Sequence, residues 1–283
     1  MHAMSYNSTS EHAVGFLLSL IEDEDAARVR RRVGLAAGPD GSPAVPHRPD
    51  AGWGHTAVPA SVLLWVLEED EPLGNAVVWR HLPAMDGLRR AIVRGRPFGP
   101  GRTEPVPVDS LVRPKGEPPV PEAYRRHGLV GALRAATTMA AGRAAASMVV
   151  MPADWRSVTE ADAERALPGY ARWALAVRPD CPPELREQFG SHPKFTHRVR
   201  QAGVLDGPAE YATEHGPARS VLSVLSTGRV LFPTRVRQAE DALRPLVRDH
   251  LGARDDAWAV LAQLMGTFYG TAPELIVTAG AIA

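Results

Sequence analysis

The chain has 283 residues, 45% of them hydrophobic and 23% charged, and its 32 basic residues balance its 32 acidic residues. This composition excludes a disordered chain and a membrane protein, and a net charge of zero gives no general attraction to nucleic acid or to an anionic membrane. The single cysteine, Cys181, excludes an intramolecular disulfide framework and a cysteine-clustered zinc or iron–sulfur site. We therefore expect a cytoplasmic globular protein without a metal or a cofactor.

The first predicted element is a helix near the amino terminus. Ser8 to Glu11 has the pattern of a capping box, and the apolar stretch Val14–Ile21 follows it. No basic region precedes this stretch and acidic residues follow it, so we expect no secretion signal. Prolines and glycines then fill Gly38–Pro59, which predicts a loop.

That loop holds the residues that come closest to a metal site. His47 and His55 lie on either side of Asp50 and Trp53. Two histidines and a carboxylate could supply three zinc ligands and leave the fourth position open, as in a metal-dependent hydrolase. The alternative, which we favour, is a proline-rich surface loop anchored by its indole.

An internal repeat is the most informative feature. Phe16–Asp25 aligns without gaps on Val62–Glu71, 46 residues further on, and each copy is an apolar helix closed by four acidic residues. A basic helix follows each copy. Periods of about 40–47 residues are typical of paired-helix solenoids, whose units bury their apolar faces by stacking on one another.

Stacking of the repeats would gather their charged residues on one surface, where we expect a protein or peptide partner to bind. The candidate residues are Glu68, Glu69, Asp70, Arg30, Arg31, Arg89 and Arg90. The arginine clusters could instead hold the phosphates of a nucleic acid. This alternative is weaker, because only 6% of the residues are aromatic and could stack on bases.

The segment Arg96–Pro121 contains eight prolines and predicts a linker or crossing loop between two helical halves, residues 1–95 and 122–283. The weakly polar run Leu129–Met151 approaches the length of a membrane span. Its two arginines, Arg134 and Arg143, would cost about 5–7 kcal/mol on insertion, so we expect no membrane association.

A segment in the second half resembles a known class of repeat. Arg178–Leu185 reads Arg-Pro-Asp-Cys-Pro-Pro-Glu-Leu, His192-Pro193 follows, and Val199–Gly203 reads Val-Arg-Gln-Ala-Gly. This pattern is similar to the leucine-rich-repeat-variant and HEAT-like units of bacterial helical repeat proteins, and Gly74–Pro83 resembles it more loosely. The resemblance covers 26 residues and implies stacked helix pairs. The founding leucine-rich-variant protein carries an iron–sulfur cluster on a separate cysteine-rich segment that this chain lacks, so the resemblance implies no cofactor here.

His192 and His197 lie five residues apart, whereas two metal ligands on one helical face prefer a spacing of three or four, so we expect no metal at this pair. Helical spacing returns in Leu243–Leu251 and Trp258–Phe268, and Thr271–Glu274 forms a second capping-box pattern.

These patterns predict an all-α protein, an irregular α-solenoid of HEAT-like helix pairs, with helix over well more than half of the chain. The residues expected in the core are Leu17, Leu18, Leu63, Leu64, Leu67, Leu185, Val199, Leu243, Leu246 and Leu261. Nucleophile and phosphate-binding motifs are absent, so we expect no catalytic residues. The predicted function is a non-catalytic scaffold or adaptor for a protein or peptide. The alternatives are a hydrolase that uses the His47–His55 loop and an arginine-lined nucleic-acid binder.

Overall fold

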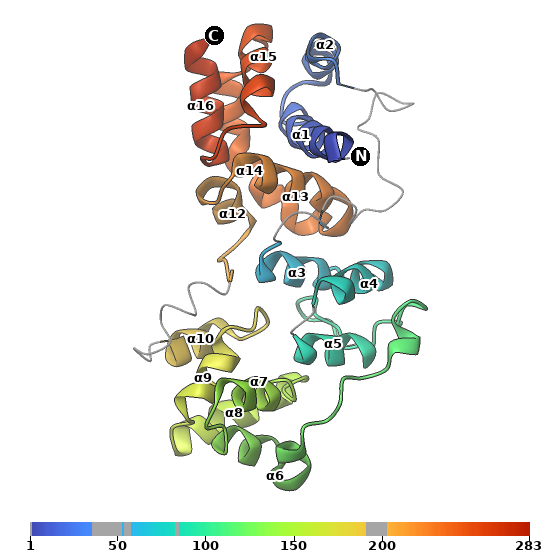
Figure 1. Ribbon diagram of the computed structural model, residues 1–283, viewed down its shortest axis with the longest axis vertical. Coiled ribbons are helices and arrows are strands. Elements are labelled where there is room, and N and C mark those ends of the chain that lie inside the picture. Colours follow the sequence, from blue (N-terminus) through green and yellow to red (C-terminus); the bar gives the residue numbers. More distant parts are fainter. Residues whose placement is uncertain (1, 36–52, 54–57, 83–84, 191–202) are drawn as a thin grey trace. The chain divides into compact units, whose positions relative to one another are not determined.

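The computed structural model describes residues 2–35, 53, 58–82, 85–190 and 203–283 (Figure 1). Every regular element in this part of the chain is a helix, and the helices cover more than half of the whole sequence, so the all-α prediction is confirmed. Within the described residues, no helix combines the length and the apolar character needed to cross a membrane.

The chain forms two compact units, and the first is discontinuous in sequence. Unit 1 comprises Met1–Val58 and Leu205–Ala283, and unit 2 comprises Pro59–Val204. These boundaries differ from those expected at 95/96 and 121/122. The proline-rich segment 96–121 lies inside unit 2.

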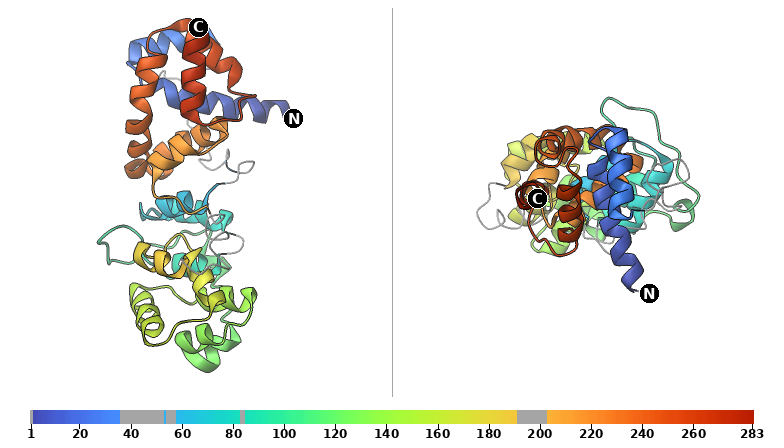
Figure 2. Two further views of the ribbon diagram at one scale, coloured as in Figure 1. Left: turned by 90° about the vertical axis from the view of Figure 1, so that its left-hand side faces the viewer. Right: turned by 90° about the horizontal axis from the view of Figure 1, so that it is seen from above.

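Unit 1 joins the amino-terminal helices to the carboxy-terminal ones (Figure 1, Figure 2). Its helices are α1 (His2–Leu18), α2 (Asp23–Val33), α12 (Pro208–Glu214), α13 (Ala218–Leu231), α14 (Pro233–His250), α15 (Asp255–Leu264) and α16 (Ala272–Ile282). The most extensive contact is between α1 and α13. Phe16 and Leu17 are buried there, and the guanidinium of Arg229 on α13 lies 5.2 Å from the centre of the Phe16 ring.

Unit 2 consists of helices that contact near neighbours in the chain, α3 with α4, α4 with α5, α6 with α7 and α8, and α9 with α7 and α10. Their bounds are α3 (Ala60–Leu67), α4 (Pro72–His81), α5 (Asp86–Val93), α6 (Glu122–Arg134), α7 (Met139–Ala146), α8 (Pro152–Glu164), α9 (Gly169–Ala176) and α10 (Pro183–Gly190). Gly142 allows α7 to approach α9 closely, because a Cβ at this position would collide with the backbone carbonyl of Tyr170.

Helix ends differ from the sequence-based expectation in unit 1. The box at Thr271 is confirmed, since its hydroxyl accepts from Glu274 N and the Glu274 carboxylate accepts from Thr271 N. Ser8, in contrast, lies inside α1, which begins at His2. The acidic run that was expected to close the first apolar helix opens α2 instead, with Asp23 in its first turn, where a helix amino terminus favours carboxylates.

Most of the expected core is buried, as the following residues show: Leu17, Leu18, Leu63, Leu67, Leu185, Leu243 and Leu261. Leu64 and Leu246 are only half-buried, and Val199 lies outside the described residues. Leu64 is on the face of α3 that is less covered, whereas Leu67 on the same helix is fully buried.

The two leucines of α3 provide a test of this packing. We expect Leu67→Ala to lower the free energy of unfolding by about 2–5 kcal/mol, because it opens a cavity in a closed core. Leu64→Ala should cost less, because that side chain already contacts solvent in the folded state. Urea denaturation of both variants measures the difference, and equal losses would contradict the burial described here.

Candidate functional site

Buried arginines organise unit 2, and the first of them is Arg90 on α5. Its side chain is fully buried, and its guanidinium donates to the backbone carbonyls of Ser147 (3.3 Å) and Pro118 (2.9 Å). It also pairs with Glu117 at 3.1 Å, and Glu117 binds Arg94 through both of its oxygens. Arg90 therefore binds the end of the proline-rich segment, at Glu117 and Pro118, to the helices of unit 2.

The start of the proline-rich segment is fastened by Asp70. This residue follows α3 in the left-handed conformation, with φ 56°, and its carboxylate accepts from Phe98 N at 2.7 Å and from Gly99 N at 3.0 Å. The side chain of Asp70 is 1% exposed. The segment is thus held at both of its ends by internal polar contacts.

A second arginine, Arg178, lies in the turn between α9 and α10. It forms a two-bond pair with Asp180 (2.9 and 2.8 Å) and donates to the backbone carbonyl of Ala146. Gly87 on α5 leaves the room for its guanidinium, because a Cβ there would collide with it. Since Arg90 binds the carbonyl of Ser147, two buried arginines satisfy carbonyls at the carboxy-terminal end of α7, where a helix favours cations.

Asp180 binds a second guanidinium as well, that of Arg96 at 3.1 Å. Burial alone would raise the pKa of Asp180, but attraction to Arg178 and Arg96 outweighs it and holds the pKa below the ordinary value. Burial lowers the pKa of Arg96, and Asp180 offsets part of that effect. Side-chain hydrogen bonds from Arg94 hold the pKa of Glu117 low as well.

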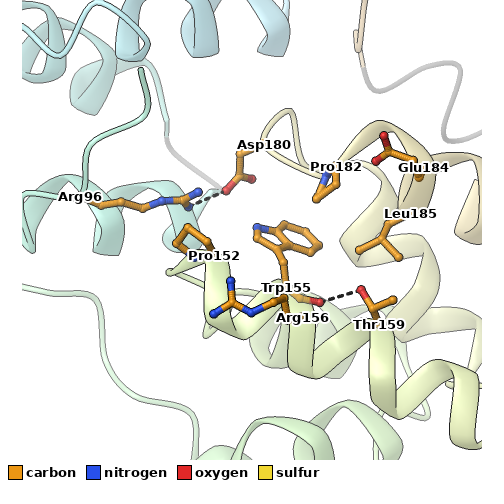
Figure 3. Close-up of a pocket in the computed structure, with 9 residues that line it drawn as sticks. All are labelled: Arg96, Pro152, Trp155, Arg156, Thr159, Asp180, Pro182, Glu184 and Leu185. Atoms are coloured by element: carbon orange, nitrogen blue, oxygen red, sulfur yellow. Dashed lines mark hydrogen bonds and ion pairs between the residues drawn. The ribbon is translucent and has the colours of Figure 1, made fainter. Parts of the chain in front are cut away.

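Beside this network lies an open cleft of about 490 Å³, shown in Figure 3. Its lining residues come from α8, from the α9–α10 turn, from the start of α10 and from the residue Arg96 after α5. They are Arg96, Pro152, Trp155, Arg156, Thr159, Asp180, Pro182, Glu184 and Leu185. Trp155 occupies the centre of the cleft in Figure 3, with Leu185 and Pro182 on one side of its ring and Pro152 on the other.

Two buried polar groups of the cleft have no hydrogen-bond partner among the described residues. The indole N–H of Trp155 and the Nε–H of Arg96 are buried without a hydrogen bond to any described residue. The nitrogen edge of the indole faces Arg96 and Asp180 (Figure 3), and the guanidinium of Arg178 lies 5.2 Å from the centre of the Trp155 ring. A buried donor without a partner costs about 1–3 kcal/mol, so a ligand with a hydrogen-bond acceptor that reached these two groups would offset that cost.

The rim of the cleft carries two exposed charges of opposite sign, Arg156 on α8 and Glu184 in the first turn of α10. Neither side chain forms a hydrogen bond or an ion pair with the described part of the chain. The hydroxyl of Thr159 donates to the Trp155 carbonyl at 2.9 Å and is therefore occupied. The cleft therefore has an apolar floor and two exposed charges at its edge, an arrangement that can bind a ligand with both apolar and charged groups.

The one thiol of the protein lies next to the cleft in sequence and is shielded. Cys181 is buried, and burial raises the pKa of its thiol to about 12. The thiol is therefore protonated at neutral pH and is a poor nucleophile. Within the described residues, no group of three His, Cys, Asp or Glu side chains has the arrangement of a metal site.

The structure places the predicted partner-binding residues in two different environments. Asp70 and Arg90 are buried and bound internally, which corrects the expectation that they are exposed charges. Arg89 is half-buried and its guanidinium lies 5.2 Å from the centre of the Trp79 ring. Glu68, Glu69 and Arg30 are half-buried and Arg31 is exposed. The two acidic runs belong to different compact units, and the binding role of these residues stays a prediction.

The two histidine pairs, His47 with His55 and His192 with His197, lie outside the described residues. No motif in the sequence predicts Arg96, Trp155 or Arg156 as site residues. Trp155 and Arg156 lie near the start of α8, which begins with a proline, and a proline is typical of a helix start. This pattern does not show whether the residues line a cleft or pack in a core.

No family model, curated protein or solved structure matches this chain. The similarity to leucine-rich-repeat-variant and HEAT-like units therefore stays a prediction from the residues that carry it.

Removal of the Asp180 charge tests the network. Asp180→Asn leaves Arg96 and Arg178 buried without their shared carboxylate, and we expect a loss of about 3–5 kcal/mol in the free energy of unfolding. Glu164→Gln is the control, because Glu164 also pairs with an arginine but its side chain is 79% exposed, so the change should be within about 0.5 kcal/mol.

The same variant should alter the response to acid. Because the folded pKa of Asp180 is lowered, its contribution is complete above the unfolded pKa of about 3.9 and is lost as the pH falls through the lower folded value. Below about pH 4, the stability of Asp180→Asn should therefore decline less steeply than that of the parent protein. The free energy of unfolding of both proteins is measured by urea denaturation at several pH values. If it declined equally steeply with falling pH in both, the lowered pKa of Asp180 would be contradicted.

Reactivity of the single thiol tests its burial. At about pH 8, we expect native Cys181 to react with a disulfide reagent roughly a thousandfold more slowly than in urea, because a pKa of about 12 leaves very little thiolate. Spectrophotometric thiol titration measures both rates. A native rate equal to the rate in urea would show that the thiol is exposed.

Proposed function

We propose that the protein is a non-catalytic adaptor of helical-repeat architecture, and that it binds a segment of a partner protein in the cleft of unit 2. The observation that carries this proposal is the cleft itself, whose floor contains the buried indole of Trp155 and whose rim carries charges without internal partners. An open cavity with a mainly apolar floor and a few polar groups is the usual form of a binding site.

The solenoid part of the proposal applies to unit 2. Its helices contact helices that are close in sequence, which is how stacked helix pairs are built. The turn that opens α10 belongs to the segment that resembles a leucine-rich-repeat-variant unit, and Pro183 is the first residue of that helix, where a missing N–H breaks no hydrogen bond. We therefore propose that α9 and α10 form one helix pair of an irregular solenoid.

The energies available suggest the type of binding. Full burial of one leucine-sized side chain contributes about 1.5–3 kcal/mol, whereas a micromolar complex requires about 8 kcal/mol. A single apolar anchor on Trp155 and Leu185 is therefore insufficient, and neighbouring residues of the partner segment have to contact the rim. Reversible binding of a short peptide segment agrees with these magnitudes.

A selection experiment tests the proposal. A phage-displayed library of random short peptides is selected on the parent protein and on two variants of α8. Thr159→Trp places a large side chain in the cleft, and we expect it to weaken binding of the enriched peptides about tenfold or more, equivalent to about 1.4 kcal/mol. Ser157→Trp is the matched control, because Ser157 is exposed on the same helix and does not line the cleft.

Circular dichroism and urea denaturation confirm that both variants fold. Enrichment of related peptides by the parent and by Ser157→Trp, and not by Thr159→Trp, supports the proposal. No enrichment on the parent protein, or equal enrichment on all three, contradicts it.

A further inference from the structure

The two ends of the cleft differ in charge. At the end near the start of α8, the guanidinium groups of Arg96 and Arg178 share the carboxylate of Asp180, and the Asp154 carboxylate is close enough to Arg96 to affect its pKa. Arg156 lines the same end of the cleft without pairing with either carboxylate. Asp154 accepts from the backbone N–H groups of two preceding residues and so closes the amino terminus of α8. Three positive groups against two negative ones leave a surplus of one positive charge.

The positive charge that is not neutralised is that of Arg156, which is exposed at the surface. Arg96 and Arg178 are buried and share Asp180, whereas Arg156 is exposed, and in Figure 3 its guanidinium lies apart from the Arg96–Asp180 pair. Glu160, one turn further along α8, does not line the cleft and forms no ion pair with Arg156 among the described residues. Arg156 is therefore a cation available to a ligand.

Glu184 supplies the opposite sign at the other end. It lies across Trp155 from Arg156 in Figure 3, and its carboxylate is exposed. The nearest arginine in sequence, Arg186, donates to the backbone carbonyls of Pro179 and Cys181, both at 2.9 Å, and is thus directed into the turn. The helix amino terminus offsets only part of a full charge, so this end of the cleft stays negative.

From this arrangement, and resting on the proposed function of the cleft, we infer the chemistry of the partner segment. It carries an apolar anchor flanked by one acidic and one basic side chain, so that the anchor packs on Trp155 and Leu185, the acid pairs with Arg156 and the base pairs with Glu184. Exposed ion pairs contribute little to affinity but discriminate against segments with the wrong charge. The two rim charges therefore set which segments bind.

Four synthetic peptide pools test this inference by fluorescence anisotropy. Each pool has a central leucine, and its flanking positions are acidic and basic, both acidic, both basic, or both neutral. We expect the parent protein to prefer the mixed pool by about two- to fivefold for each matched charge at low salt, and to lose the preference at high salt.

Charge reversal on the rim should change which peptide pool the protein prefers, and the direction of each change can be stated. Arg156→Glu makes both ends negative and should favour the doubly basic pool, and Glu184→Arg should favour the doubly acidic pool. The double variant restores one charge of each sign and should restore the preference for the mixed pool. Both residues are exposed and without internal partners, so the variants should unfold at the same urea concentration as the parent.

The outcomes separate the two proposals. If all four pools bound with equal affinity and the charge reversals changed nothing, the inference that the segment carries one acidic and one basic side chain would be wrong. The cleft would still be a peptide-binding site. Failure of every pool to bind, including the neutral one, would overturn the inference and count against the proposed function itself.

Discussion

The pairing of buried guanidinium groups with Asp180 is the interaction on which the architecture of unit 2 depends. Arg178 joins the α9–α10 turn to the end of α7, and Arg96 joins the residues after α5 to the same carboxylate. Transfer of such charges out of water costs several kcal/mol for each ion, and only close pairing with further hydrogen bonds offsets that cost. Arg90 repeats this arrangement with Glu117 and the carbonyl groups of the proline-rich segment.

The cleft is a consequence of this network. Asp180 and Arg96 form one of its walls, and Arg178 lies against the ring of Trp155, which forms its floor. Because buried charges hold the wall and the floor, the partner segment that we propose would meet a surface whose shape is already set. Preorganisation of this type lowers the entropy lost on binding.

Sequence periodicity predicted the helical fold and most of its core, because residues such as Leu67 and Leu243 repeat at the spacing of one helical face. It failed where tertiary contacts decide the role of a residue. Arg96 and Asp180 are 84 residues apart, and Asp70 binds backbone groups 28 and 29 residues away, so no local pattern marks them. The cleft requires both a fold and a register between helices, which a single sequence does not provide.

Arg96 and Arg156 show that an arginine side chain has a different role when it is buried and when it is exposed. Both line the cleft, but Arg96 is buried against the Asp180 carboxylate, and removal of that carboxylate would leave Arg96 as an unpaired buried charge. Arg156 is exposed, so its replacement costs little in folding and its charge is available to a ligand. In the function that we propose, stability and partner selectivity would thus rest on separate sets of charges. Substitutions on the rim would change the preferred segment without disturbing the buried network that shapes the cleft.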